Sequence, residues 1–289
     1  MWLLQDLING LVLGCVYAGF ALGLSLVFGI LGIINVAHSA LLVLAALAYF
    51  EFVNGLGVDV LLAAVPVLAI FLLLGTGMYR PLVRRLEREH DTTILLVFFG
   101  VMVVVESAAV MVWTTDTRNV SIGYLAKTLR LGELGVPLGR LVAAALTIVL
   151  FVAVYLFLTR TLTGAAVRGM AQNRDVAQMV GIPVSRLAMY VFGAGIALAG
   201  FGGVVLGLTL PFSPQDHVRW LAWAFLIVII GGLGNVANTF LAGLGLGLVE
   251  TFAGSFLPFQ YTYLIIYLLL ALVLLLRSEG LRGTAVRTL

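Results

Sequence analysis

The stretch NGLVLGCVYAGFALGLSLVFGILGIINVAHS, residues 9–39, decides the class of protein. Its first part is apolar for long enough to form a helix that crosses a hydrocarbon core about 30 Å thick. The apolar run then breaks at Gly29 and Gly32, and the polar residues Asn35, His38 and Ser39 follow. Irregular backbone at membrane depth is tolerated only where protein or a water-filled cavity surrounds it. The break therefore predicts a transport pathway or a tight protein interface.

The rest of the chain is equally hydrophobic. Of 289 residues, 62% are hydrophobic and only 10% are charged, and the mean hydropathy is +1.17. These values exclude a water-soluble domain and predict one all-α polytopic membrane domain over residues 1–289. We expect about eight to nine transmembrane segments, including a re-entrant or half-length helix pair. The apolar segments lie at 7–28, 31–53, 58–78, 93–113, 137–158, 187–210, 220–233, 236–256 and 261–276.

Basic residues predict the orientation. Eleven of the sixteen Lys and Arg residues lie in 79–92, in 159–186 and after residue 276. Because cytoplasmic loops carry an excess of Lys and Arg, these three segments are expected in the cytoplasm and the N-terminus outside. The net charge of +3 is spread over short loops rather than gathered in one stripe, so no nucleic-acid partner is expected.

A second glycine-rich break, GGLGNVANT, occupies residues 231–239. The hairpin around it, 220–256, must begin and end outside, yet 220–233 covers only about 20 Å at 1.5 Å per residue. We therefore expect a half-length helix there. The two breaks are either equivalent parts of an internal repeat, which in carriers marks a transport site, or two different breaks. We favour the second interpretation, in which NVANT serves backbone geometry.

Small residues recur at steps of four in two apolar segments. Such spacing lets helix backbones approach closely, which is a usual source of helix association in lipid. We expect these residues to serve helix packing, with a subunit contact as an alternative. The two series are Gly195, Ala199, Gly203 and Gly207, and Thr239, Gly243, Gly247, Thr251 and Ser255.

Two acidic residues, Glu106 and Glu250, lie inside predicted spans. An ionisable group within a membrane is costly and by default functional. No Lys or Arg lies within a span to pair with either carboxylate, so the alternatives are protonation, snorkelling or a bond to Ser107 or Thr251. We interpret Asn35, His38, Ser39, Tyr17 and Glu250 as candidates for the translocation pathway.

Enzyme chemistry has little support. The chain has no G-x-x-x-x-G-K-[ST] motif, its three His residues lie in different segments, and Cys15 is its only cysteine. A P-loop ATPase, a zinc site and a nucleophilic triad are therefore not predicted. We expect no catalytic residue, no metal and no cofactor.

The loop 159–186 is polar and basic, and residues 160–187 read RTLTGAAVRGMAQNRDVAQMVGIPVSRL. Thr163 and Asn173 are candidate caps of two short helices, and Gly181 with Pro183 supplies a stop. An apolar face of Val167, Met170, Ala177 and Val180 accompanies the arginines. We interpret the loop as a docking surface for a soluble partner, with an amphipathic helix on lipid headgroups as the alternative.

The chain resembles the permease subunits of high-affinity branched-chain amino acid ABC importers. NGLVLGCVYAGFALGLSLVFGILGIINVAHS resembles the family's opening stretch, and RGMAQNRDVAQMVGIPVSRLAMYVFGAGIALAGFGG its cytoplasmic loop and next span. FLIVIIGGLGN resembles the late glycine-rich hairpin, and RSEGLRG the tail. Ser39 stands where the family usually has glycine, and NVANT replaces its usual run of small residues.

The resemblance implies a bacterial inner-membrane importer that works by alternating access. The implied partners are a second, similar permease in a heterodimer, two cytoplasmic ATPase subunits and an external substrate-binding protein. The resemblance also implies that coupling helices enter a groove on an ATPase. The residues it places there are Arg168, Gly169, Asn173, Arg174, Ala177 and Gly181.

Two alternatives stay open at this stage. An importer of the same family could carry urea, short amides or aromatic acids. A secondary transporter or channel that works alone belongs to another class; it would need a charge network in the membrane and would not need the helical loop at 163–181.

Overall fold

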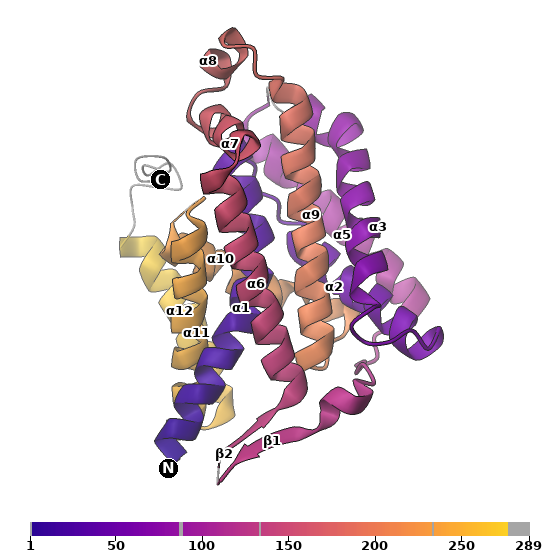
Figure 1. Ribbon diagram of the computed structural model, residues 1–289, viewed down its shortest axis with the longest axis vertical. Coiled ribbons are helices and arrows are strands. Elements are labelled where there is room, and N and C mark those ends of the chain that lie inside the picture. Colours follow the sequence, from indigo (N-terminus) through magenta and orange to yellow (C-terminus); the bar gives the residue numbers. More distant parts are fainter. Residues whose placement is uncertain (1, 87–88, 133, 233, 277–289) are drawn as a thin grey trace.

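The computed structural model describes residues 2–86, 89–132, 134–232 and 234–276. Its helices run mostly along one long axis and form a bundle (Figure 1). The elements in chain order are α1 (Trp2–Leu31), α2 (His38–Phe50), the π-helix η1 (Glu51–Gly55), α3 (Ala64–Met78), the π-helix η2 (Tyr79–Val83), α4 (Arg84–Leu86), α5 (Asp91–Trp113), the 3-10 helix η3 (Gly123–Ala126), β1 (Thr128–Leu131), β2 (Leu134–Pro137), α6 (Leu138–Arg160), α7 (Leu162–Gln172), α8 (Arg174–Met179), α9 (Val184–Thr209), the 3-10 helix η4 (Pro214–Asp216), α10 (His217–Gly231), α11 (Val236–Phe256) and α12 (Phe259–Leu276).

The predicted all-α polytopic class is confirmed. Seven helices of the described chain are long and apolar enough to cross a membrane, and Tyr261–Val273 adds a shorter apolar segment. The predicted apolar segments each contain most of one helix, but the predicted count of eight to nine spans is not confirmed. α10 has only 15 residues. At 1.5 Å per residue it rises about 22 Å, less than the hydrocarbon thickness of about 30 Å. The expected half-length helix is therefore α10, followed by the 21-residue α11.

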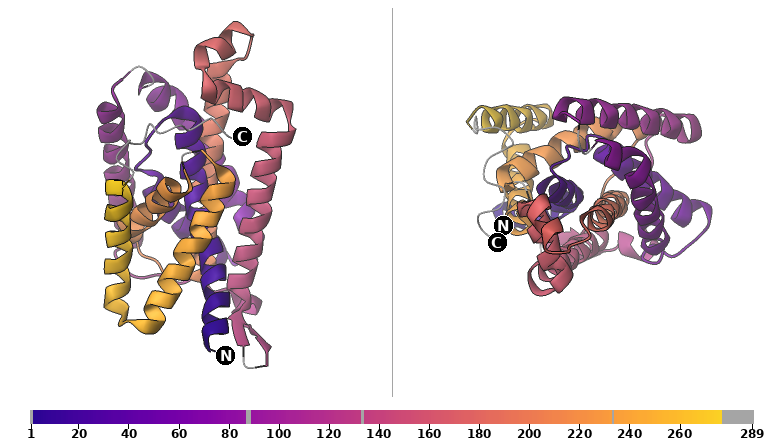
Figure 2. Two further views of the ribbon diagram at one scale, coloured as in Figure 1. Left: turned by 90° about the vertical axis from the view of Figure 1, so that its left-hand side faces the viewer. Right: turned by 90° about the horizontal axis from the view of Figure 1, so that it is seen from above.

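The centre of the bundle consists of α1 and α9. In these helices 83% and 89% of the span residues are buried, against 22% in both α3 and α5 and 28% in α6. The view along the bundle shows α1 and α9 enclosed by the other helices (Figure 2). Their positions follow from their small residues, because Gly, Ala and Ser let neighbouring backbones approach. The outer helices turn their bulky apolar side chains outward, as lipid contact requires.

The arginine-rich segments gather at one end of the bundle. In Figure 1 α7 and α8 lie at the top, whereas the N-terminus of α1 and the β1–β2 hairpin lie at the bottom. Residues from 79–84 and 178–190 line one common cleft, and Arg174 of α8 donates to the carbonyl of Leu31, the last residue of α1. The segments 79–86 and 159–186 therefore share one side, as the charge pattern predicted. The RSEGLRG stretch of the tail lies outside the described residues.

The hairpin of β1 and β2 was not predicted. Thr128 pairs with Pro137 and Leu131 with Leu134 in an antiparallel register, and Gly132 adopts φ +65° in the turn. Gln5 of α1 fixes the hairpin to the bundle: its side-chain amide donates to Gly135 O at 2.8 Å and accepts from Gly135 N at 2.9 Å. Strands of four residues in a polar outer loop leave too short a pattern to recognise.

Candidate functional site

The first break lies between α1 and α2. Gly32 adopts φ +71° and its N–H bonds to Phe28 O, so it ends α1 in the manner of a left-handed C-terminal residue. Gly29, which the sequence suggested as part of the break, still belongs to α1. The chain then reverses through residues 33–37, and α2 begins at His38.

The polar residues of this break are inside the subunit. Asn35 and His38 are fully buried and Ser39 is 1% exposed. His38 Nε2 lies 3.0 Å from Phe20 O of α1, which joins α2 to the centre of the bundle. The remaining polar side-chain atoms, Asn35 Nδ2 and Oδ1, His38 Nδ1 and Ser39 Oγ, make no hydrogen bond within the described chain.

Four orphan polar atoms within five residues are unusual. Leaving a buried donor or acceptor unsatisfied costs about 1–3 kcal/mol for each group, and native proteins contain only a few such groups per 100 residues. Such a concentration indicates groups whose partners are supplied in another state of the protein or by water.

The second break touches the end of α1, directly before the first break. Gly232 and Gly234 adopt φ +86° and +78°, and Asn235 caps α11 by accepting from Asn238 N at 3.0 Å. A Cβ on Gly234 would lie 2.8 Å from Gly29 Cα. The two stretches, which are about 200 residues apart in the chain, therefore form one contact inside the bundle. The capping by Asn235 agrees with a geometric role for NVANT.

A seam of small residues continues from this contact along α1 and α11. The hydroxyls of Ser25 and Thr239 lie 2.9 Å apart. A Cβ on Gly243 would lie 2.7 Å from Ala18 Cβ, and a Cβ on Gly247 would meet the backbone of Gly14. The two backbones thus approach too closely for larger side chains.

The other small-residue series lies on the central helix α9. A Cβ on Gly195 would collide with Val27 of α1, one on Gly203 with α2, and one on Gly207 with Tyr49. Ala199 is completely buried. In this chain the series therefore packs against helices of the same subunit.

A charged aromatic cluster occupies the opposite half of the bundle from α8. Trp223 Nε1 donates to Glu250 Oε2 at 2.9 Å, and the Tyr17 side chain faces the same carboxylate. The Arg219 guanidinium carbon lies 4.4 Å from the ring centroid of Trp220 and 5.5 Å from that of Trp223. Glu250 thus has an indole partner rather than the Ser or Thr partner that the sequence suggested.

Glu106 also has a neighbour that the sequence did not suggest. His217 Nε2, at the start of α10, lies 3.6 Å from Glu106 Oε2 of α5. This distance exceeds a hydrogen bond and permits an ion pair when the imidazole is protonated. Sequence reasoning considered only Lys, Arg, Ser and Thr as partners and so missed both His217 and Trp223.

The loop of α7 and α8 is built from two capped helices, but its first cap differs from the prediction. Thr161, not Thr163, caps α7 by accepting from Gly164 N at 2.9 Å. An N-cap residue has extended φ and ψ, and Thr161 has these values, whereas Thr163 is already part of the helix. Asn173 caps α8 by accepting from Asp175 N and Val176 N, both at 3.0 Å, and Gly181 adopts φ +85°.

The apolar side chains of this loop do not form the single face that the sequence predicted. Val167, Met170 and Ala177 are buried against the bundle, so they do not form an outer surface. The apolar side chains that α8 and its C-terminus do expose are Val176, Met179 and Val180, at 53%, 84% and 71%. The predicted coupling residues Arg168, Gly169 and Arg174 are half-buried between these two sets.

The structure thus brings some of the predicted site residues together and separates others. Asn35, His38 and Ser39 share the break, and Tyr17 and Glu250 share the charged aromatic cluster. The aromatic rings of Tyr17, Phe20 and Trp220 connect the two groups, with centroids 5.2 Å apart for Phe20 and Trp220. The coupling residues lie at the other end, next to the last turn of α1.

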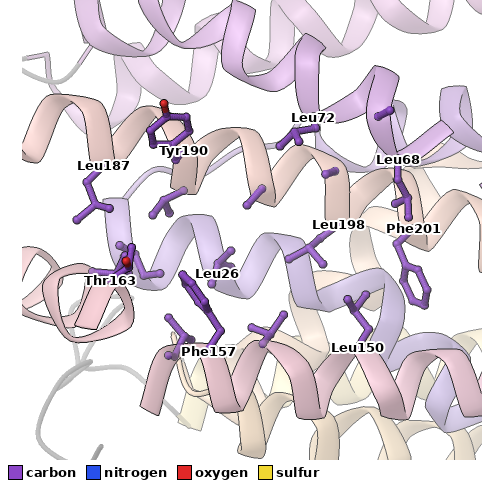
Figure 3. Close-up of a pocket in the computed structure, with 18 residues that line it drawn as sticks. Leu26, Leu68, Leu72, Leu150, Phe157, Thr163, Leu187, Tyr190, Leu198 and Phe201 are labelled. Carbon is purple, nitrogen blue, oxygen red and sulfur yellow. The ribbon is translucent and has the colours of Figure 1, made fainter. Parts of the chain in front are cut away.

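An apolar groove lies elsewhere in the bundle. A groove of about 550 Å³ runs between α3 and α6 over α1 and α9. Leucines and Phe157 of these helices point into it (Figure 3). None of the residues that line this groove belongs to the predicted pathway.

A bundle of apolar helices with buried polar breaks and a folded loop at one end is the architecture of a multi-pass membrane protein. The chain belongs to the family described as "branched-chain amino acid transport system / permease component", whose model matches residues 7–274. It is therefore a permease subunit of a transport system.

Relatives of similar length agree with this family. The chain is 27% identical over 303 residues to the high-affinity branched-chain amino acid transport system permease protein LivH of Escherichia coli. The alignment covers 98% of this chain and 96% of that protein. It is 28% identical over 298 residues to BraD of Pseudomonas aeruginosa, with 97% and 95% covered. A probable branched-chain amino acid transport permease protein LivM of Methanocaldococcus jannaschii is 27% identical over 154 residues, 46% of this chain and 45% of that protein. No solved structure gives a significant match.

Proposed function

We propose that this chain is one of two permease subunits of an ATP-driven importer for branched-chain amino acids. The observation that carries the proposal is its likeness, over nearly the whole length, to permeases whose names state this substrate class. Matches to proteins named LivH and LivM support a second, related permease as partner. Two cytoplasmic ATPase subunits and an external binding protein complete the proposed complex.

The surface proposed for the ATPase is the tip formed by α7 and α8. It combines the exposed apolar side chains of Val176, Met179 and Val180 with Arg174. An apolar patch of this kind outside the bilayer is a common mark of a protein contact. α8 is only six residues long and is capped at Asn173, so it forms a compact knob that can enter a groove.

Arg174 supports a route from this tip to the break. Its guanidinium NH2 group donates to Leu31 O at 3.3 Å, and Leu31 is the last residue before Gly32. A movement of α8 driven by closure of the ATPase pair would therefore act on the end of α1. The break can follow because glycine backbones at 32, 232 and 234 tolerate changes that other residues resist.

Alternating access would then give the orphan polar atoms their partners. In the described state Asn35, His38 and Ser39 are closed within the subunit. Opening of the break would expose them to water or to the zwitterionic end of an amino acid, and the hydrogen bonds gained would offset part of the opening energy. We assign the pathway role to this group, with Tyr17 and Glu250 towards the outer side.

The test is transport by the reconstituted complex. The chain is expressed with the proposed second permease and the ATPase subunits, and the complex is placed in proteoliposomes with ATP inside and the binding protein outside. ATP-dependent leucine uptake is expected. Uptake without any ATPase subunit would instead establish a carrier that works alone, and uptake of urea, short amides or aromatic acids in place of leucine would change the substrate.

A further inference from the structure

A cleft of about 660 Å³ at the cytoplasmic end of the bundle is basic. It lies between the η2–α4 segment and the turn from α8 to α9. Three of its described lining residues are arginines, Arg80, Arg84 and Arg186, and none carries a carboxylate. Arg80 and Arg84 are four residues apart, a spacing that brings helical side chains together and is unfavourable for like charges without a counter-ion. The cleft therefore has the charge of a site for an anion.

The apolar groove of Figure 3 begins where this cleft ends. Tyr190 of α9 lines both hollows. In Figure 3 its ring lies on the side of α9 away from Phe157 and Thr163. Leu72 of α3 lines the groove, and Tyr79, the first residue of η2, lines the cleft. The two residues are seven positions apart along consecutive helical turns and thus lie on the same face. The two hollows share a wall and form one path.

The dimensions of the groove suit a hydrocarbon chain. From Leu187 to Phe201 it follows α9 for fourteen residues, which at 1.5 Å per residue is about 21 Å. This length exceeds half of a hydrocarbon core about 30 Å thick, so the groove is long enough for an acyl chain of one leaflet. Its lining is almost entirely aliphatic and aromatic, including Leu68, Leu150, Phe157 and Leu198.

From these two hollows we propose a binding site for one anionic phospholipid of the cytoplasmic leaflet. The phosphate lies in the cleft of Arg80, Arg84 and Arg186, Ser185 offers a hydroxyl, and Tyr190 stands at the level of the glycerol. One acyl chain follows the groove between α3 and α6. Basic pockets between transmembrane helices on the cytoplasmic side are typical sites for anionic headgroups.

The contact of this lipid with α9 and with the α8–α9 turn gives it a regulatory position. Gly181 and Pro183 line the cleft and connect α8 to α9. A lipid that holds Arg80 and Arg186 to one phosphate would fix η2 and α9 relative to each other. This site is separate from the proposed substrate pathway and does not depend on the substrate.

Native mass spectrometry of the purified full-chain permease complex tests the site. Dioleoyl phosphatidylglycerol and dioleoyl phosphatidylcholine are titrated against the wild type, against Arg80→Gln/Arg186→Gln, and against Arg84→Gln. The matched control is Arg85→Gln/Arg160→Gln, which removes two exposed charges at the same end of the bundle but none from the cleft. Gel filtration verifies that each variant is monodisperse.

The wild type is expected to bind one phosphatidylglycerol at least about tenfold more tightly than the cleft variants, and the control to stay within about twofold of the wild type. Ala197→Leu, which fills the groove, should weaken lipid binding although every arginine is kept. Equal retention of phosphatidylcholine would overturn the proposal. So would equal competition by inorganic phosphate or glycerol phosphate, which would indicate a simple anion site, or loss of the lipid when the ATPase subunits bind, which would make the cleft a protein interface.

Discussion

The side-chain oxygens of Ser25 on α1 and Thr239 on α11 lie 2.9 Å apart, and both residues are completely buried. This bond joins the two glycine-rich regions of the chain one turn below the contact of Gly29 with Gly234. In a membrane such hydrogen bonds contribute about 0.6 kcal/mol on average, and up to about 1.7 kcal/mol.

We predict that Ser25→Ala and Thr239→Ala are not additive. Each single change breaks the same bond, so the double variant should lose less stability than the sum of the two. A double-mutant cycle on the purified protein in detergent should give a coupling energy of about 0.5–1.5 kcal/mol. Additive losses would mean that the two hydroxyls do not act as a pair.

Gly243 is expected to be indispensable for the α1–α11 seam. A Cβ added at this position would lie 2.7 Å from Ala18 Cβ. Gly243→Ala should therefore destabilise the protein by about 1–3 kcal/mol, as overpacking does. Gly245→Ala is the matched control on the same helix, because nothing lies within 4 Å of its Cβ. Thermal unfolding of both variants compares them directly, and equal melting temperatures would contradict the seam.

His38→Ala should stop transport while the protein still inserts. It removes the bond to Phe20 O, a loss of about 1 kcal/mol of stability, and the cavity left by the fully buried imidazole adds to this loss. Leucine uptake in proteoliposomes should fall at least about tenfold. Tyr49→Phe, also buried on α2 and also losing one bond to a backbone carbonyl, should transport normally. Wild-type uptake by His38→Ala at normal expression would remove His38 from the pathway.

Arg174→Glu is expected to uncouple the complex. The change breaks the bond to Leu31 O and reverses the charge of the proposed docking tip. The variant should insert and assemble, but substrate and binding protein should no longer stimulate ATP hydrolysis. Arg160→Glu, on the same end of the bundle but outside α8, controls for the charge. Unchanged stimulated ATPase activity in Arg174→Glu would count against the coupling route.

Glu250→Gln separates the charge from the hydrogen bond. The Gln side chain keeps an oxygen that can accept from Trp223 Nε1, so melting temperature should stay near that of the wild type. If Glu250 serves the pathway through its charge, uptake should fall, and Glu250→Leu should lose both stability and uptake. Full uptake by the Gln variant would leave only the structural bond to Trp223 for this residue.

Much of the fold could be predicted because it depends on local pattern. Apolar runs separated by arginine-rich loops identify spans and their common side, since the bilayer requires both regardless of how the helices pack. Asn173 and Gly181 marked the ends of α8 through their own backbone preferences. The cap at Thr161 was misplaced by two residues, because Thr161 and Thr163 are the same residue type and only the backbone conformation distinguishes them.

The candidate site could be predicted only in part. A break with Asn35, His38 and Ser39 indicated where to look, yet its hydrogen-bond partner is a backbone carbonyl, and every residue has one. The neighbours of Glu250 and Glu106 are Trp223 and His217, which come from α10 and were not considered because partners of carboxylates were sought among Lys, Arg, Ser and Thr. The Thr128–Pro137 hairpin was missed because its strands are too short to give a period.

The sequence by itself determined a polytopic helical permease, the position of its two breaks and the end of the bundle that carries the arginines. These depend on residue type along the chain, through hydrophobic transfer, glycine conformation and charge. Only the tertiary structure decided that the break before α11 touches the end of α1, where Gly234 meets Gly29, and that Arg174 reaches Leu31. Contacts between residues some 140 to 200 positions apart follow from how helices pack, and close packing depends on the shapes of both faces at once, which no single stretch of sequence contains.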